Sequence, residues 1–404
     1  MPELRRSLSL PLVVLYGVGV TIGAGIYVLL GATAGKAGIH APVSFAMAAI
    51  VMAFSAATFA ELSARLPVSA GEAAYVRAGF GSAGLSLLVG CLVISSGVVS
   101  SAAITVGSIG YIQEFLDLDR YVLVPVILLF MGGVAAWGIK ESVTFASLFT
   151  LVEAGALVAI IVLGLMDRPE ILSNIPKVFP SPTDLPAWTA ISGAALLAFF
   201  AFIGFEDIVN LAEEVEQPAR IMPLAILITL VVGTVLYFLV AAVAVFSVPL
   251  EELAASQAPL SLVFGQITGA SPILITAIAI VATLNGVVIQ IIMASRVVYG
   301  LGKQGSFPAA FASIHPRTQT PVIATGTVVL VVLVLAMAFP VDRLAEWTAR
   351  IVLVIFSLVN GSLILLKARK IPAPDGAFTA PFWVPVGGLL TCLALLAIDV
   401  TTGV

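Results

Sequence analysis

The stretch GVGVTIGAG, Gly17–Gly25, lies in the middle of an apolar segment that runs from about Leu8 to Ala34. This segment is longer than the roughly 20 residues that a helix needs to cross a bilayer. Four of the nine quoted residues are glycine, and each glycine costs a helix interior on the order of 1 kcal/mol relative to alanine. Irregular backbone at membrane depth is tolerated only where protein buries it or where it lines a wet cavity. The stretch therefore predicts an interrupted helix with a solute site, and close helix packing through small residues is the alternative interpretation.

The composition is that of a polytopic membrane protein. The 404 residues are 60% hydrophobic and only 10% charged, whereas a soluble domain carries about 25% charged residues. A formal net charge of −4 indicates no nucleic-acid partner. Cys91 and Cys392 both lie in apolar segments, so we expect neither a disulfide framework nor a metal site, and no cofactor.

Apolar segments of membrane-spanning length recur along the chain and predict an all-α protein with about eleven transmembrane helices. The predicted spans are Leu12–Ala34, Pro42–Leu62, Leu85–Ile112, Tyr121–Trp137, Val143–Leu165, Trp188–Leu211, Pro223–Val248, Pro272–Tyr299, Pro321–Phe339, Ala345–Leu366 and Pro381–Val400. With the N-terminus inside, twelve Lys and Arg residues fall on the cytoplasmic side and six on the outer side. The positive-inside rule therefore predicts that the N-terminus lies on the cytoplasmic side of the membrane. We expect that membrane to be the cytoplasmic membrane.

The sixth predicted span repeats the interruption of the first. In FFAFIGFED, Phe199–Asp207, Gly204 lies within the span and two acidic residues follow it. Carboxylates at bilayer depth cost several kcal/mol unless they face a wet cavity or a partner. Spans one and six hold corresponding positions if the chain consists of two five-helix halves, and such a pair of interrupted spans indicates an inverted-repeat transporter.

These stretches also resemble the amino acid–polyamine–organocation (APC) superfamily, most closely its cationic amino acid transporter-like branch. The resemblance is carried by GVGVTIGAGIYVLLGATAGKAG (Gly17–Gly38), FAELSARLPVSAGEAAYVRAGFG (Phe59–Gly81), GIKES (Gly138–Ser142), FFAFIGFEDIVNLAEEVEQPARIMP (Phe199–Pro223) and SRVVYGLGKQGSFPAAFASIHPRTQTP (Ser295–Pro321). It implies the LeuT-like five-plus-five inverted-repeat fold in one transmembrane domain, residues 1–404. The first repeat would be residues 8–167, the second 187–370, and residues 381–404 would add an eleventh helix, whereas the superfamily usually has twelve.

The resemblance implies a binding site for amino acids at the two interruptions. In relatives the substrate carboxylate meets backbone amides of the first interruption, here Gly23, Ala24 and Gly25. Carbonyl groups of both interruptions bind the amino group, here Thr21, Phe200, Ala201 and Ile203. Physical chemistry favours the same arrangement, because a helix that begins after a break offers free N–H groups and a positive dipole end to an anion. Phe200 also matches the aromatic gate of relatives, with ordinary apolar packing as the alternative.

Glu153, in TLVEAG (Thr150–Gly155), is the most informative departure from the superfamily. Proton-coupled relatives have a lysine at the matching position, where its ammonium group takes the place of a sodium ion. A buried glutamate without a partner tends to stay protonated, so Glu153 is a candidate for carrying the coupling proton or for helping to bind a cation. The alternative is a protonated glutamate that is hydrogen-bonded to a neighbouring helix. Ser295 is its expected neighbour by analogy with relatives.

Three further groups of polar residues are weaker candidates. Glu206 matches an acid linked to proton sensitivity in relatives, and the alternative is a carboxylate that stabilises the unwound backbone. Asp207 is a candidate for attracting a cationic side chain. Ser101, Thr105 and Ser108 recur at helical spacing in the third span, where they either face the substrate or serve helix packing.

The sequence thus predicts a secondary active transporter, an amino acid permease that works by alternating access and is coupled to protons. Amino acid exchange without proton coupling is the first alternative, and sodium as the coupling ion stays open. A non-transporting solute sensor is disfavoured because the chain has no sizeable soluble segment. An enzyme is not expected, since no metal-ligand cluster, nucleophile–base pair or phosphate-binding loop is present. The predicted partners are an amino acid and the lipid bilayer, and the sequence leaves the oligomeric state open.

Overall fold

The protein is helical throughout the part of the chain that its computed structural model describes, residues 8–22, 25–67, 71–137, 143–212, 215–318, 320–374 and 376–402. Within these ranges the backbone forms α-helices and short 3-10 helices. A single isolated bridge between Leu8 and Val215 is the nearest approach to a strand pairing there. The all-α prediction is therefore confirmed.

The first half of the chain contains seven α-helices, the shortest of which has 10 residues. A 3-10 turn, η1 (Gly38–His40), joins the second and third of them. The helices are α1 (Leu10–Ile22), α2 (Gly25–Ala37), α3 (Ala41–Arg65), α4 (Gly71–Phe80), α5 (Ala83–Gln113), α6 (Arg120–Trp137) and α7 (Val143–Asp167).

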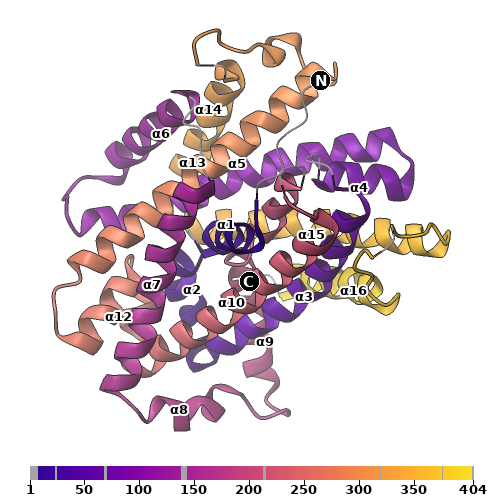
Figure 1. Cartoon of the computed structure of the whole chain (residues 1–404). Helices are drawn as coiled ribbons and strands as arrows, with labels where there is room; N and C mark the ends of the chain where they lie inside the picture. Colours follow the sequence, from indigo (N-terminus) through magenta and orange to yellow (C-terminus); the bar gives the residue numbers. More distant parts are fainter. Residues whose placement is uncertain are drawn as a thin grey trace.

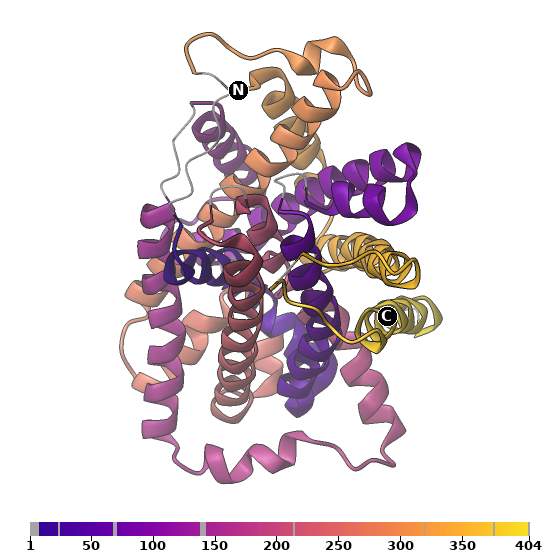
Figure 2. The same cartoon turned by 45° about the vertical axis from the view of Figure 1, so that its right-hand side comes forward.

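Two short elements, α8 (Ile171–Asn174) and η2 (Ile175–Val178), form the connection between the halves. In both views this connection lies at one end of the molecule, and the segment that follows α13 lies at the opposite end (Figures 1 and 2). The second half and the C-terminal helix comprise α9 (Leu185–Phe200), η3 (Phe205–Leu211), α10 (Pro218–Ser247), α11 (Leu250–Ala255), α12 (Pro259–Thr268), α13 (Ile273–Lys303), η4 (Ala309–Ala312), α14 (Val322–Ala338), α15 (Val341–Ala368) and α16 (Trp383–Thr402).

Helical stretches long and apolar enough to cross a membrane number nine in the described chain. One of them, Gly25–Arg65, contains both α2 and α3, and α14, with 17 residues, is classed among the shorter apolar helices. Each of the eleven predicted spans consequently has a helical counterpart, with α1 and α2 together forming the first. The chain is a multi-pass membrane protein.

The outward faces of the peripheral helices are apolar, as a lipid environment requires. On α6 the exposed side chains include Val126, Leu129, Phe130 and Trp137, the last of which is 79% exposed. A soluble protein rarely leaves so large an apolar surface in contact with water. The interior is built on aromatic contacts between helices, for example Phe59 of α3 against Phe205 of η3 and Phe356 of α15.

Helices at the same position in the two halves pack against one another. The second spans of the halves, α3 and α10, lie side by side, as do the third spans, α5 and α13, and the fourth spans, α6 and α14. The two broken spans also meet, because α2 contacts α9 and α1 contacts η3. This pairing brings the two interruptions together in the middle of the bundle.

Candidate functional site

The first interruption separates α1, which ends at Ile22, from α2, which begins at Gly25. The predicted site residues Gly23 and Ala24 lie outside the described residues. Gly25 packs so tightly on the backbone of Ala201 that a side chain at position 25 would overlap the Ala201 Cα atom. Gly19 is in similarly close contact with the Thr150 side chain. Close packing and helix interruption therefore occur together in this stretch, and the glycines serve both.

The second interruption is a tight turn of residues 201–204 between α9 and η3. Gly204 has a φ of +126°, a conformation that other residues rarely adopt. Its backbone N–H donates to Glu206 Oε2 at 2.8 Å, so a side chain satisfies a donor that the broken helix leaves without a carbonyl partner. This hydrogen bond is the contact that is expected if the Glu206 carboxylate stabilises the unwound backbone.

One tyrosine hydroxyl joins the two interruptions. The Tyr237 Oη atom of α10 lies 2.8 Å from the carbonyl oxygen of Thr21 and 3.0 Å from that of Ala201. Phe202 packs edge-on against the Tyr237 ring, with 5.0 Å between ring centroids. One hydroxyl group thus lies within hydrogen-bonding distance of a carbonyl at the end of α1 and of a carbonyl in the turn after α9.

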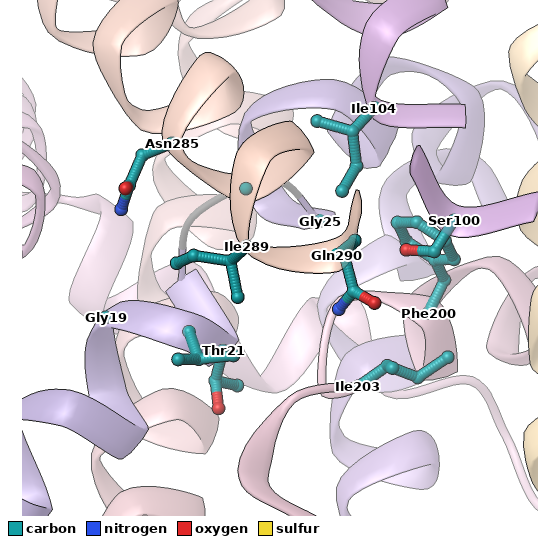
Figure 3. Close-up of a pocket in the computed structure, with 12 residues that line it drawn as sticks. Gly19, Thr21, Gly25, Ser100, Ile104, Phe200, Ile203, Asn285, Ile289 and Gln290 are labelled. Carbon is teal, nitrogen blue, oxygen red and sulfur yellow. The ribbon is translucent and has the colours of Figure 1, made fainter. Parts of the chain in front are cut away.

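A cavity lies between the interruptions and the third and eighth spans (Figure 3). The space between its walls, open solvent included, is about 410 Å³, and Figure 3 shows the side chains that line it. The lining residues are Gly19, Val20, Thr21, Gly25, Ser100, Ile104, Phe200, Ile203, Asn285, Gly286, Ile289 and Gln290. Four of the predicted substrate-binding residues, Thr21, Gly25, Phe200 and Ile203, therefore lie around one cavity. Ala201, the fifth described one, is fully buried against Gly25 and does not line it.

Three polar lining residues were not predicted from the sequence. Gln290 and Asn285 come from α13 and Ser100 from α5. Figure 3 shows the Gln290 amide near the centre of the group, with Asn285 farther out and Ser100 beside Phe200. The sequence did contain an indication for Asn285 and Gln290, because they are uncharged polar residues within an otherwise apolar predicted span.

Glu153 of α7 lies close to the first interruption. Its side chain is buried, and neither carboxylate oxygen has a hydrogen-bond partner among the described residues. The Tyr27 hydroxyl donates to the Glu153 backbone carbonyl at 2.9 Å and ties α7 to α2. Ser295, its expected neighbour, is buried on α13 and donates to the Ile291 carbonyl at 2.6 Å.

The hydroxyl groups predicted on the third span donate hydrogen bonds to carbonyl groups of their own helix. Ser101, Thr105 and Ser108 are buried and donate to carbonyls of α5 three or four residues earlier. Among the serines of this helix, Ser100 is the one that lines the cavity. The three predicted hydroxyl groups are thus satisfied within their own helix and are not among the residues that line the cavity.

A second, smaller cavity is lined by three acidic residues, Glu72, Glu206 and Asp207. All three side chains are more than nine-tenths buried. Glu72 belongs to α4, which is too short to span a membrane. Burial raises the pKa of Glu72 to about 7, an effect that a hydrogen bond from its own backbone N–H partly offsets.

The chemistry available at the first cavity is that of solute binding. Carbonyl oxygens of the interruptions are acceptors for an ammonium group, and the first N–H groups of α2 are donors for an anion. Within the described chain no group of three or more His, Cys, Asp or Glu side chains is placed to hold a metal ion. Two broken helices that meet at a buried cavity inside a membrane-spanning bundle are the arrangement of a secondary transporter.

Comparison with known proteins identifies the family. The sequence matches the family described as "Amino acid permease" over residues 8–403, and the chain belongs to this family of the APC superfamily. Its members are transporters, not enzymes.

Named relatives span several kinds of transporter. The chain is 29% identical over 98% of its length to the branched-chain amino acid permease BcaP of Bacillus subtilis, of which it covers 88%. It is 32% identical over 93% of its length to the vacuolar cationic amino acid transporter 4 of Arabidopsis thaliana, and spans 65% of that longer protein. It is also 28% identical over 95% of its length to a methylthioribose transporter of Bacillus subtilis, of which it covers 86%.

Proposed function

We propose that this protein carries amino acids across the cytoplasmic membrane by alternating access. The observation that supports the proposal best is the cavity between the two interruptions, because it gathers Thr21, Gly25, Phe200 and Ile203 from both broken spans. A zwitterion fits this arrangement, with its carboxylate at the start of α2 and its ammonium group at the carbonyls of Thr21 and the 200–203 turn. Gly23 and Ala24 would complete the carboxylate site.

The pairing of equivalent helices supports two inverted repeats, residues 8–167 and 187–370, with residues 381–404 as an additional helix. Contacts between α3 and α10, α5 and α13, and α6 and α14 are those that a pseudo-two-fold axis in the membrane plane would generate. In this proposal one repeat moves against the other around the midplane site. The N-terminus is cytoplasmic.

We propose that transport is coupled to protons through Glu153. The side chain is 1% exposed, and an ionised carboxylate so placed costs several kcal/mol without a cation or proton beside it. Glu153 lies on α7, which packs on α1, and its backbone carbonyl accepts from Tyr27 of α2, so its side chain is placed beside the broken helix. Ser295 and Glu206 have supporting roles, Glu206 by holding the Gly204 N–H. No cofactor takes part.

The test is uptake of labelled amino acids into proteoliposomes that contain the purified full-length protein. Branched-chain and cationic amino acids are measured with an inward proton gradient and, separately, with amino acid inside as counter-substrate. We expect the gradient to raise wild-type uptake at least fivefold, and Glu153→Gln to abolish this response while keeping exchange. The matched control is Glu170→Gln, at an exposed acid between α7 and α8.

If wild type and Glu153→Gln both exchange and neither responds to the gradient, the protein is an exchanger and Glu153 is structural. A sodium gradient that replaces the proton gradient as the driving force would overturn proton coupling. If no amino acid enters the liposomes under any of these conditions, the proposal of amino acid transport is wrong.

A further inference from the structure

Arg296 is an exposed cation within the membrane-spanning part of α13. Its side chain is exposed, although those of Ser295 and Val298 beside it are buried. Gln290, which lines the substrate cavity, lies six residues earlier, so Arg296 is about 9 Å farther along the helix axis. Half of the hydrocarbon core measures about 15 Å. Since the proposed substrate site is near the midplane, Arg296 lies at a depth where lipid does not solvate a guanidinium group.

The face of α13 that carries Arg296 begins at the wall of the substrate cavity. Asn285 and Ile289 line that cavity (Figure 3), and they precede Arg296 by eleven and seven residues. Because an α-helix completes a turn every 3.6 residues, these spacings put the three side chains on one face. The neighbouring helix α5 packs on another face, where its Gly97 meets Ala294, and α1 packs on α7 and α10. Arg296 thus lies on the side of α13 that leads from the cavity toward the C-terminal end of the helix.

The part of the chain that the structure describes supplies no anion to this guanidinium group. None of the ion pairs found there involves Arg296. This holds even for the acids of the second cavity, although Met293 of the same helix lines that cavity. From Leu253 to Val341 the sequence contains neither aspartate nor glutamate. Ionisable residues at such a depth face a wet cavity and are typical of substrate paths, so an anionic group that passes along the path is the partner that the fold itself lacks.

We propose that Arg296 binds the carboxylate of the amino acid while it moves between the substrate cavity and the cytoplasm. The inference rests on the proposed function and adds to it a second, transient site on the inner side. A guanidinium group suits this role, because its planar fork donates to both oxygens of a carboxylate at once. Since every amino acid carries this carboxylate, the second site does not select among side chains.

The experiment measures exchange of labelled L-leucine in right-side-out and in inverted membrane vesicles from cells that produce the full-length protein. L-lysine replaces leucine if the protein carries only cationic amino acids. The half-saturating concentration in the bath reports the outer face in the first preparation and the inner face in the second. We expect Arg296→Gln to raise the inner value at least fivefold and to leave the outer value within about twofold of wild type. Arg296→Lys keeps the charge and should give an intermediate inner value. Arg317→Gln, at an exposed arginine after the end of α13, should change neither value.

A cysteine variant keeps the test decisive if Arg296→Gln does not fold. Inverted vesicles that contain Arg296→Cys, in a background without Cys91 and Cys392, are treated with a methanethiosulfonate that carries either a trimethylammonium or a sulfonate group. Both products come from the same folded protein and differ in the sign of the charge that is attached at position 296. The cationic product should show an inner half-saturating concentration at least threefold below that of the anionic product. The protein without cysteine, treated in the same way, should show no difference.

The possible outcomes separate this inference from the proposed function. Exchange with the same inner half-saturating concentration in wild type, Arg296→Gln and both modified products overturns the inference and leaves the proposed function standing. An equal rise at the two faces also overturns it, because Arg296 would then act on the fold or on the acids of the second cavity. If no amino acid is taken up at all, both the inference and the proposed function are wrong.

Discussion

At the residue scale, Gly25 is the position where the backbones of the two interrupted spans touch. A Cβ atom there would overlap the Ala201 backbone, and backbone cannot move aside as the end of a flexible side chain can. We therefore expect Gly25→Ala to push α2 away from α9, at a cost of about 1–3 kcal/mol in stability. Amino acid uptake should fall at least tenfold. The measurement is uptake in proteoliposomes together with thermal melting in detergent.

Gly326 of α14 supplies the control for this substitution. A Cβ atom at position 326 meets no atom within 4 Å, so Gly326→Ala should leave uptake within about twofold of wild type. Equal uptake by the two alanine variants would show that the close contact between Gly25 and Ala201 is not needed for transport.

Glu72 is a residue whose titration we expect to govern stability near neutral pH. Burial raises its pKa from 4.5 to about 7 in the folded protein. Between these values the folded state holds a proton that the unfolded state has lost, so stability should fall as pH rises from 4.5 to 7, by on the order of 3 kcal/mol in total. Glu72→Gln should flatten this dependence in melting curves recorded from pH 4.5 to 8. A slope in the variant equal to that of wild type would assign the effect to Glu206 and Asp207, the acids that share the cavity.

Sequence reasoning located the two interruptions better than the side chains around them. Glycines in apolar segments have a direct physical cost, and this cost pointed to the breaks at Gly17–Gly25 and at Gly204, whereas Thr21, Gly25 and residues 200–203 were predicted from the resemblance to the APC superfamily. Gln290 and Ser100 were missed because nothing in a single sequence says which face of α13 or α5 meets the breaks. The neighbour relation of Glu72 to Asp207 was equally invisible, since 135 residues of chain separate them.

At the element scale, α15 is fastened to the bundle by ion pairs near both of its ends. Glu61 of α3 accepts from Arg65 and from the Ala380 N–H, and pairs with Lys367 of α15 at 2.8 Å. Toward the other end, Glu346 pairs with Lys36 of α2 at 2.8 Å. These contacts tie α15 to both α2 and α3.

Removing the Glu61 charge should loosen the attachment between α3, α15 and the segment before α16. The Glu61 side chain is fully buried, while those of Arg65 and Lys367 are 9% and 14% exposed, so Glu61→Gln leaves two largely buried cations without their partner. We expect a loss of about 3 kcal/mol in stability and faster hydrogen exchange at residues 371–380. Glu251→Gln, at an exposed acid of α11, should change neither. Hydrogen exchange in Glu61→Gln as slow as in wild type would contradict the proposal that Glu61 anchors α15 and the segment before α16.

The helices themselves were largely predictable, whereas the short elements between them were not. Apolar length fixed the number and rough bounds of the spans, including the short α6. The short helices α4, α11 and α12 have 10, 6 and 10 residues, and at such lengths a helix depends on tertiary packing more than on its own sequence. The break within the sixth span was predicted at Gly204, whereas α9 already ends at Phe200 and the turn begins at Ala201, the residue that packs against Gly25.

At the scale of the whole molecule, the predicted orientation places the α8 connection outside and the segment after α13 inside. Ser181 and Ser313 are exposed residues of these two connections. In a background without Cys91 and Cys392, we expect a membrane-impermeant maleimide to label Ser181→Cys in intact cells. The same reagent should label Ser313→Cys only after the membrane is permeabilised. The reverse pattern would invert the topology and place the N-terminus outside.

The Tyr237 hydroxyl has one hydrogen atom and lies within bonding distance of two carbonyl oxygens, one from each broken span. At any instant it can donate to only one of them, so the pair has one donor too few. An arriving ammonium group can donate to the Thr21 carbonyl from the cavity and leave the tyrosine hydrogen to Ala201. The empty transporter is thus one donor short where its broken spans meet, and a solute that brings a donor of its own makes up the difference.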